Sequence, residues 1–304
     1  MLDRIIRFIG VSFFGIAVWL IAKEIHLVGW TYLWATVLKT PKCLMITAFG
    51  VVCLNYLFLS GYDLLALGHI GIKLPYPKIL EASGVSFAFS NTTGHTYAAG
   101  GAIRYLFYVP EGVGRLNILK MVIFETISIL IGLWASFEIA VLLHFIGENG
   151  RMNQFEINTL AIIMGFLFLL YYSFIVRQKR TLKWGKLTLS APSWKETIKQ
   201  CLVGIGDNTT LFLCFYVLLC FFVPAPFTNV FMIFMVAQSV GFATQVPGGI
   251  GVFEGTFLNL FPHTIDQKAG ILAALILFRV FYYFLPFLLS VLYLGIRFIR
   301  RKIS

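Results

Sequence analysis

The sequence carries little charge for its length. Only 12% of its 304 residues are Asp, Glu, Lys or Arg, whereas a soluble domain normally has about 25%. Hydrophobic residues make up 59% of the chain, and the mean hydropathy is +0.86. This composition excludes a soluble globular protein and indicates a membrane protein.

Motifs of the common enzyme classes are also missing. The chain has no Gly-x-Ser-x-Gly, no His-Glu-x-x-His, no phosphate-loop lysine and no Asp-x-Asp pair. Its five cysteines form no Cys-x-x-Cys pair and lie in or beside apolar runs, which favours packing over disulfide or metal binding. No polar tract exceeds about 25 residues. We therefore predict one membrane domain over residues 1–304, with no cofactor, no metal site and no separate catalytic domain.

Six uninterrupted apolar runs are long enough to cross the roughly 30 Å of bilayer hydrocarbon. They cover residues 5–22, 43–60, 118–146, 157–176, 201–223 and 269–296. Arg4 and Arg7 lie at the start of the first run, but no small-residue cleavage site follows it, so we interpret it as a retained span rather than a signal peptide.

Two further apolar runs, 82–103 and 229–261, contain glycine-rich breaks. The first break is Gly94–Gly101 and the second is Pro247–Gly251. Backbone that leaves the helix at membrane depth must have its polar groups satisfied by protein or by a polar cavity. Matched breaks in the two halves of a chain are typical of transporter binding sites.

Charge predicts the orientation. Segment 177–199 carries a net charge of +6 and residues 297–302 another +4, which is ten of the eleven net positive charges. By the positive-inside rule both stretches, and both termini, face the cytoplasm of an inner membrane protein. The loop 23–42 is mildly basic and speaks against this orientation in the first half. Nucleic-acid binding is not expected, because no soluble domain presents these charges.

The number of membrane crossings then predicts the topology of the two segments that contain the breaks. A chain that leaves and returns to one side crosses an even number of times, so 82–103 and 229–261 are predicted to be re-entrant hairpins. Matched elements start at residues 5 and 157, 82 and 229, and 118 and 269, so one displacement of about 150 residues relates them. The sequence thus predicts an all-α fold of about six spans and two hairpins. These form an inverted repeat of residues 1–147 and 157–304.

Polar residues in both breaks are candidates for binding a lipid headgroup. They are Ser90, Asn91, Gly94, His95, Gly100, Gly101, Arg104, Gln245, Pro247, Gly248, Gly249, Glu254 and Arg279. Arg104 suits bidentate binding of a phosphate, although a snorkelling interfacial cation is the alternative. Glu254 is predicted to pair with Arg279, since a charge at membrane depth needs a partner or water. Catalysis on a lipid phosphate by His95, Arg104 and Glu254 stays open.

Four other ionisable residues lie within apolar runs: Glu125, Glu138, His144 and Asp207. Glu125 is a second possible partner for Arg104 or Arg279. Asp207 precedes Asn208, and we interpret it as a hydrated helix cap near the inner interface.

Three motifs occur in an order that resembles a known family. They are Ser90-Asn91 with Gly94, Gly100-Gly101 and Arg104-Tyr105; Pro247-Gly-Gly-Ile-Gly-Val-Phe-Glu-Gly255; and Arg279 with Tyr282-Tyr283 and Pro286. Nearly the whole chain is similar to the membrane region of bacterial lysylphosphatidylglycerol synthases and their stand-alone relatives.

The resemblance implies a flippase. In that family the membrane region is regarded as moving aminoacylated phosphatidylglycerol from the inner to the outer leaflet, while a carboxy-terminal domain makes the aminoacyl ester. This sequence ends at Ser304 without that domain, so lipid movement is implied and lysyl transfer is not. Phospholipids are the expected partners. A homo-oligomer, a separate lipid-modifying enzyme as partner, and a non-transporting regulator of lipid or envelope synthesis are alternatives.

Overall fold

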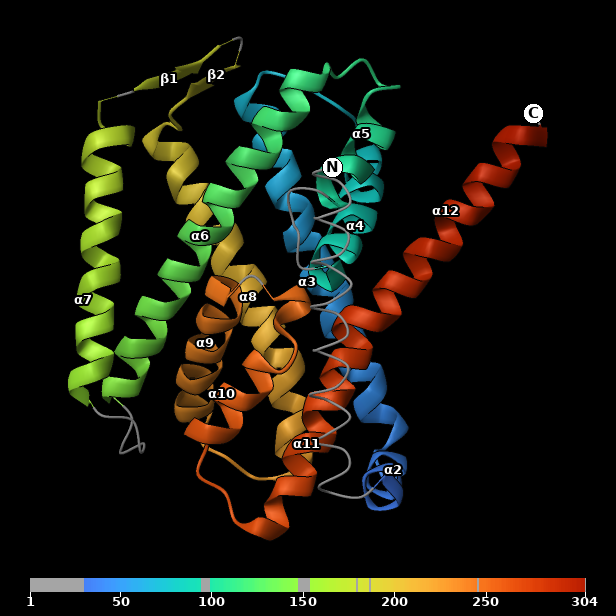
Figure 1. Cartoon of the computed structure of the whole chain (residues 1–304), viewed down its shortest axis with the longest axis vertical. Coiled ribbons are helices and arrows are strands. Elements are labelled where there is room, and N and C mark those ends of the chain that lie inside the picture. Colours follow the sequence, from blue (N-terminus) through green and yellow to red (C-terminus); the bar gives the residue numbers. More distant parts are fainter. Residues whose placement is uncertain are drawn as a thin grey trace, which may run out of the picture. The chain divides into compact units, whose positions relative to one another are not determined.

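The computed structural model describes residues 30–93, 99–146, 154–178, 180–185, 187–244 and 246–303. Its elements run in the order α2 (Trp30–Leu38), α3 (Lys42–His69), α4 (Tyr76–Thr93), α5 (Gly101–Tyr108), α6 (Arg115–Ile146), α7 (Gln154–Tyr171), the π-helical turn η2 (Tyr172–Val176), β1 (Thr181–Trp184), β2 (Leu187–Ser190), α8 (Trp194–Phe222), α9 (Phe227–Thr244), the 3-10 turn η3 (Pro247–Gly249), α10 (Val252–Leu260), α11 (Ile265–Arg279), the π-helical turn η4 (Val280–Phe284) and α12 (Leu285–Ile303). Figure 1 labels them.

Six helical stretches in the described part of the chain are long and apolar enough to cross a membrane: Lys42–His69, Arg115–His144, Asn158–Val176, Trp194–Phe222, Phe227–Thr244 and Gln267–Arg300. Five of them overlap predicted spans, whereas the predicted span 5–22 lies outside the described residues. The sixth, Phe227–Thr244, is the first arm of the segment predicted to be the second hairpin. The all-α, multi-pass membrane fold is thus confirmed, and the two re-entrant hairpins stay predictions.

The chain divides into two compact units. Unit 1 comprises Met1–Val52, Ala88–Thr96 and Phe212–Ser304, and unit 2 comprises Cys53–Phe87 and Tyr97–Leu211. Three helices, α3, α4 and α8, contribute residues to both units. The predicted inverted repeat stays a prediction.

The core of unit 1 is a cluster of phenylalanine rings. Phe215 on α8 lies with its ring centroid 4.8 Å from Phe257 on α10, 5.5 Å from Phe278 on α11 and 5.6 Å from Phe234 on α9. Phe253 joins them, 5.2 Å from Phe234. Three of these four pairs are edge-to-face, and each such pair adds about 0.5–1.5 kcal/mol beyond area burial. The cluster therefore packs α9 and α10, the helices that flank the second break, against α8 and α11.

In unit 2 two glycines bring helices into close contact. A Cβ built on Gly204 of α8 would lie 2.1 Å from the Cα atom of Gly132 on α6, and a Cβ on Gly132 would lie 2.5 Å from the Cα atom of Gly204. Small residues allow this close approach, which gives membrane helices their dispersion contacts. Leu59 and Tyr62 of α3 and Phe87 of α4 form a buried cluster in the same unit.

A short β-hairpin lies within the basic segment between α7 and α8. β1 and β2 pair antiparallel, with Thr181 opposite Ser190 and Trp184 opposite Leu187, and Gly185 in the turn has a φ of 58°. The hairpin is one element that the charge pattern did not indicate. Figure 1 shows it following α7 and preceding α8.

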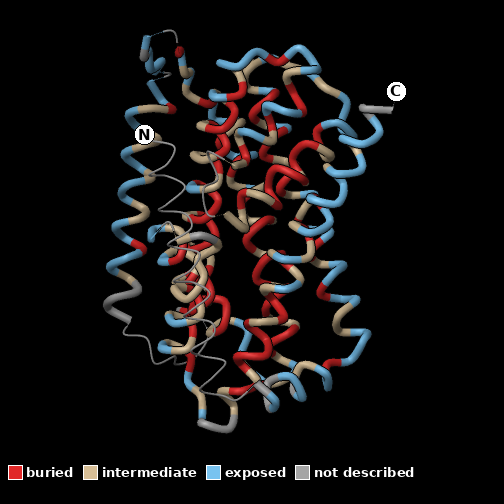
Figure 2. Tube along the Cα trace, turned by 45° about the vertical axis from the view of Figure 1, so that its right-hand side comes forward, coloured by how far each residue is buried: buried red, intermediate tan, exposed pale blue. Residues whose placement is uncertain are grey.

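Many large apolar side chains are exposed on the isolated chain, as the pale blue stretches in Figure 2 indicate. On α7, Ile162 is 71% exposed, Phe166 59% and Leu167 58%. Such a continuous apolar surface would be unfavourable in water. It is the expected surface of a helix that faces lipid.

We predict that Gly204→Ala destabilises the protein. The added methyl group would meet backbone rather than a movable side chain, so α6 and α8 must separate, at a cost of about 1–3 kcal/mol. Thermal unfolding in detergent measures this effect. Gly68→Ala is the matched control, because a Cβ there has nothing within 4 Å and alanine is the better helix former. Equal midpoints for the two variants would contradict the close contact.

Candidate functional site

The first break separates α4 from α5. The predicted site residues Gly94 and His95 lie outside the described residues. Gly100, the N-cap of α5, has ordinary right-handed helical angles, φ −63° and ψ −40°. A Cβ on Gly101 would lie 3.6 Å from the Val122 side chain, which is ordinary van der Waals contact. The backbone conformation at Gly100 and the packing around Gly101 therefore do not require glycine.

Arg104 on α5 lies in a buried ion-pair cluster. Its side chain and that of Asp63 on α3 are both 0% exposed. Arg104 Nε lies 3.1 and 3.2 Å from the two Asp63 oxygens, and Nη2 lies 2.6 Å from Asp63 Oδ1 and 3.0 Å from Glu125 Oε2 on α6. Tyr108 donates its hydroxyl to Asp63 Oδ2 at 2.6 Å, and the Phe87 ring faces the guanidinium at 4.8 Å. A snorkelling interfacial cation is thereby excluded.

This cluster retains unused hydrogen-bonding capacity. Arg104 Nη1 and Glu125 Oε1 are buried, and neither has a hydrogen-bond partner among the described residues. A buried polar group without a partner costs about 1–3 kcal/mol, and more when it is charged. One donor and one acceptor are therefore available to a group that does not belong to the cluster.

The second break is built from glycines in a left-handed conformation. Gly248, Gly249 and Gly251 have φ values of 60°, 62° and 81°, a region in which L side chains are strained. Pro247 begins the turn η3, and the predicted site residue Gln245 lies outside the described residues. Here, unlike at Gly100, the backbone conformation requires glycine.

Arg279 holds this glycine turn in place. Its Nε lies 2.6 Å from Glu254 Oε1, its Nη1 donates to the carbonyl oxygen of Gly248, and its Nη2 lies 3.4 Å from that of Gly249. The other carboxylate oxygen, Glu254 Oε2, accepts a hydrogen bond of 2.7 Å from the N–H of Gly251. The predicted Glu254–Arg279 pair is thus present, and it satisfies backbone groups that the break leaves without helical partners.

The end of α4 contacts the same part of unit 1. Asn91 Nδ2 lies 3.5 Å from the Tyr282 hydroxyl, and Thr92 Oγ1 lies 3.5 Å from the Tyr283 carbonyl oxygen. Both tyrosines belong to η4, which directly follows Arg279. π-Helical turns inside α-helices often occur at functional sites. The Tyr283 ring also faces the Arg279 guanidinium, with 4.5 Å between the ring centroid and the guanidinium carbon.

The predicted site residues are distributed over both units. Unit 1 holds Ser90, Asn91, Pro247, Gly248, Gly249, Glu254 and Arg279, and unit 2 holds Gly100, Gly101 and Arg104. Ser90 is 1% exposed, and its hydroxyl has no partner among the described residues. Their assignment to a lipid headgroup stays a prediction.

Asp63 belongs to the Arg104 cluster, but the sequence patterns do not predict it. The second apolar run was ended at residue 60, whereas α3 continues to His69 and carries Asp63 into the interior of unit 2. The available signal for this pair was a single acid, Asp63, just beyond an apolar run, together with a single arginine, Arg104, elsewhere in the chain.

The interpretation of Asp207 as a hydrated cap is wrong. α8 begins at Trp194, so Asp207 lies in the helix interior, where it is 9% exposed. Asn55 Nδ2 donates to Asp207 Oδ1 at 2.9 Å, and the Tyr62 hydroxyl donates to Asp207 Oδ2 at 3.0 Å. Asn55 Nδ2 also lies 2.9 Å from Thr210 Oγ1. These bonds join α3 to α8 within unit 2.

We predict that Asp63→Asn destabilises the protein strongly. The change removes the bidentate partner of a fully buried guanidinium, and removing one partner of a buried ion pair costs about 3–5 kcal/mol. The midpoint of thermal unfolding in detergent measures the loss.

Glu111→Gln is the matched control for Asp63→Asn. Glu111 pairs with Lys78, and these side chains are 30% and 48% exposed, so the pair contributes at most about 1 kcal/mol. A loss for Asp63→Asn as small as that for Glu111→Gln would show that Arg104 does not depend on Asp63.

Comparison with known proteins supports the predicted resemblance. No family model matches the chain. It is 29% identical over 284 residues to the uncharacterized protein slr0712 of Synechocystis, an alignment that covers 91% of this chain and 87% of that protein. It is 27% identical over 275 residues to the inner membrane protein YbhN of Escherichia coli, covering 87% of this chain and 83% of YbhN.

A third relative is much longer than the region that aligns with this chain. The phosphatidylglycerol lysyltransferase of Bacillus subtilis is 25% identical over 240 residues, which are 77% of this chain but 27% of that enzyme. The aligned quarter is its membrane part, and no catalytic domain is evident in this chain. The chain is therefore a multi-pass membrane protein related to the membrane region of the lysylphosphatidylglycerol synthases, and it matches the stand-alone relatives of that region.

Proposed function

We propose that this protein carries an anionic or aminoacylated phospholipid between the leaflets of the inner membrane, with both termini in the cytoplasm. The relationship to the membrane part of the phosphatidylglycerol lysyltransferases supports a lipid substrate. The basic segment 177–199 and the basic residues 297–302 support the orientation.

The observation that carries the proposal is the unused donor and acceptor at the buried cluster. Arg104 Nη1 suits the phosphate of a lipid headgroup, because a guanidinium binds phosphate through charge-assisted hydrogen bonds. Glu125 Oε1 suits an ammonium or hydroxyl group of the same headgroup. A headgroup that carries both groups satisfies both atoms, while its acyl chains stay in the surrounding lipid.

The closed state of the cluster fits a carrier better than an open channel. Arg104 is 0% and Glu125 3% exposed, so a headgroup reaches them only when the surrounding side chains move apart. A polar headgroup in hydrocarbon without partners costs several kcal/mol. A buried site that replaces those partners lowers the barrier to crossing, and this step needs no nucleotide.

Two other functions make different predictions. A membrane regulator of lipid or envelope synthesis would bind a protein partner and leave lipid movement unchanged. An intramembrane enzyme would change the lipid covalently. Among the described residues no group of three or more His, Cys, Asp or Glu residues is placed to hold a metal ion.

We predict that Arg104→Lys slows lipid movement at least about tenfold in liposomes. Lysine keeps the charge beside Asp63 but lacks the planar fork, so it loses the unused donor; one charge-assisted hydrogen bond is worth about 1.5–3 kcal/mol. The measurement is the rate at which a fluorescent phospholipid in one leaflet becomes accessible to a quencher in the other.

A control variant and two further measurements make this test specific to Arg104. Lys195→Gln removes an exposed lysine at the start of α8 and leaves the rate unchanged. Unfolding midpoints of both variants show whether Arg104→Lys still folds, and mass spectrometry of the lipids detects any covalent change. A folded Arg104→Lys protein with the wild-type rate would refute the role of Arg104, and a modified lipid would favour an enzyme.

A further inference from the structure

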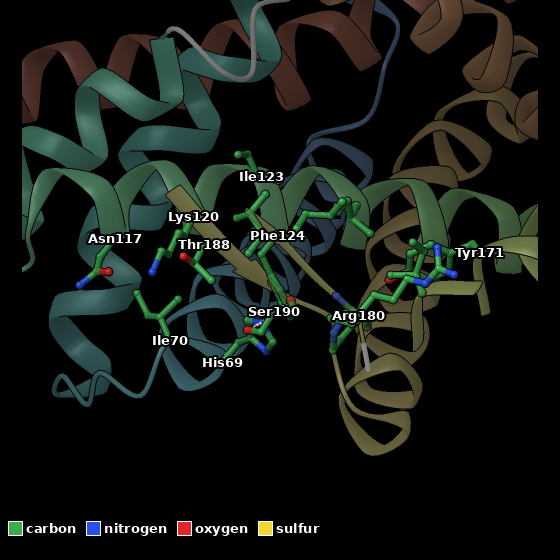
Figure 3. Close-up of a pocket in the computed structure, with 17 residues that line it drawn as sticks. His69, Ile70, Asn117, Lys120, Ile123, Phe124, Tyr171, Arg180, Thr188 and Ser190 are labelled. Atoms are coloured by element: carbon green, nitrogen blue, oxygen red, sulfur yellow. Dashed lines mark hydrogen bonds between the residues drawn. The ribbon is translucent and has the colours of Figure 1, made fainter. Parts of the chain in front are cut away.

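A cavity of about 270 Å³ lies in unit 2, and no residue of the Arg104 cluster lines it. Its walls are the first turns of α6, the ends of α3 and α7, the β-hairpin and the start of α8. Figure 3 shows the side chains of Lys120 and Arg180 on either side of His69 and Ser190. The cavity therefore lies where these helices begin or end, next to the hairpin formed by β1 and β2.

The charge of the cavity is positive. Lys120 and Arg180 line it, and no acidic residue is among its described lining residues. Neither cation takes part in an ion pair with a described residue. Two cations that share a partly enclosed space without a carboxylate favour an anion.

One wall is held rigidly. His69 Nδ1 lies 2.9 Å from Glu196 Oε1, and His69 Nε2 lies 3.1 Å from the Ser190 carbonyl oxygen and 3.0 Å from Ser190 Oγ. The imidazole ring also stacks on Phe124, with centroids 4.6 Å apart. These contacts fix the hairpin to α3, α6 and α8, so the cavity is preorganised for a ligand.

Two buried polar atoms in the cavity wall have no partner. Gln200 is 0% exposed; its Nε2 donates to Ser128 Oγ at 2.8 Å, but its Oε1 has no hydrogen-bond partner among the described residues. The Tyr171 hydroxyl is likewise buried without a partner there. A ligand that brings a hydroxyl group would satisfy Gln200 Oε1, which accepts only.

Apart from Asn117 and Thr188, most of the remaining lining is apolar. Ile123 and Ile127 on α6 and Ile175 in η2 belong to helices long enough to span the membrane. The volume of about 270 Å³ is many times the roughly 15 Å³ that one water molecule needs. A headgroup fits this space, whereas two long acyl chains do not and must remain outside, along the isoleucines.

We propose that this cavity binds the phosphate of an anionic phospholipid headgroup that also carries a hydroxyl group. Lys120 and Arg180 bind the phosphate, Gln200 accepts a hydrogen bond from the hydroxyl, and the isoleucines contact the start of the acyl chains. This site is separate from the Arg104 cluster, and its occupancy does not depend on lipid movement.

The test is a titration of the full-length protein in non-ionic detergent with short-chain phosphatidylglycerol. We expect Lys120→Gln and Arg180→Gln each to weaken binding about tenfold, the effect of losing one charge-assisted hydrogen bond. Gln200→Met, which keeps the side-chain length but removes the acceptor, weakens binding severalfold. Lys195→Gln, an exposed lysine outside the cavity, leaves the affinity unchanged.

A parallel titration with glycerol 3-phosphate separates a lipid from a free phosphate ester. We expect it to bind at least tenfold more weakly, because it does not contact the isoleucines. Equal affinity would overturn the assignment to a lipid, and unchanged affinity in Lys120→Gln and Arg180→Gln would overturn the site itself. The titration contains no transport step, so its failure is distinguishable from a failure of the liposome assay.

Discussion

The structure depends on a rule of the bilayer interior: a buried charge or a free backbone group must find its partner within the protein. Arg104 and Arg279 illustrate this rule in their respective units. Each belongs to a helix that adjoins or contacts a break, and each is paired with a carboxylate at 2.6 Å. Removing either carboxylate would leave a guanidinium without compensation, a larger penalty than most packing defects produce.

The two arginines use their hydrogen-bonding capacity differently. Arg279 bonds to Glu254 and to the carbonyl oxygens of Gly248 and Gly249, so it stabilises a left-handed turn that has few other partners. Arg104 bonds to Asp63 and Glu125 and still retains Nη1. Arg279 thus satisfies the backbone of the second break, whereas the Arg104 cluster retains groups that suit a ligand. This difference is why the proposed transport rests on Arg104.

Sequence patterns predicted the helical spans and the Glu254–Arg279 pair, because apolar runs and lone charges are local signals. They did not predict Asp63, since the charged residue itself ended the apolar run, although α3 continues past it to His69. Asp207 was misread because Asn-Thr-Thr follows it, a pattern typical of a cap; its true partners, Asn55 and Tyr62, are about 150 residues away in sequence. The hairpin around Gly185 had a signal in the alternation Leu-Thr-Leu-Ser, which the lysines obscured.

The charges of the two polar regions of unit 2 favour different headgroups. The buried cluster contains two carboxylates and one arginine, so a ligand with only a phosphate would add negative charge where acids already prevail. A headgroup with an ammonium group beside its phosphate avoids this penalty, because the ammonium interacts with Glu125 Oε1. The cavity lined by Lys120 and Arg180 has no acid among its described lining residues and so favours a net anionic headgroup. The two proposals therefore assign headgroups of different charge balance to separate parts of one unit, so occupancy of the cavity and the proposed lipid movement can be tested independently.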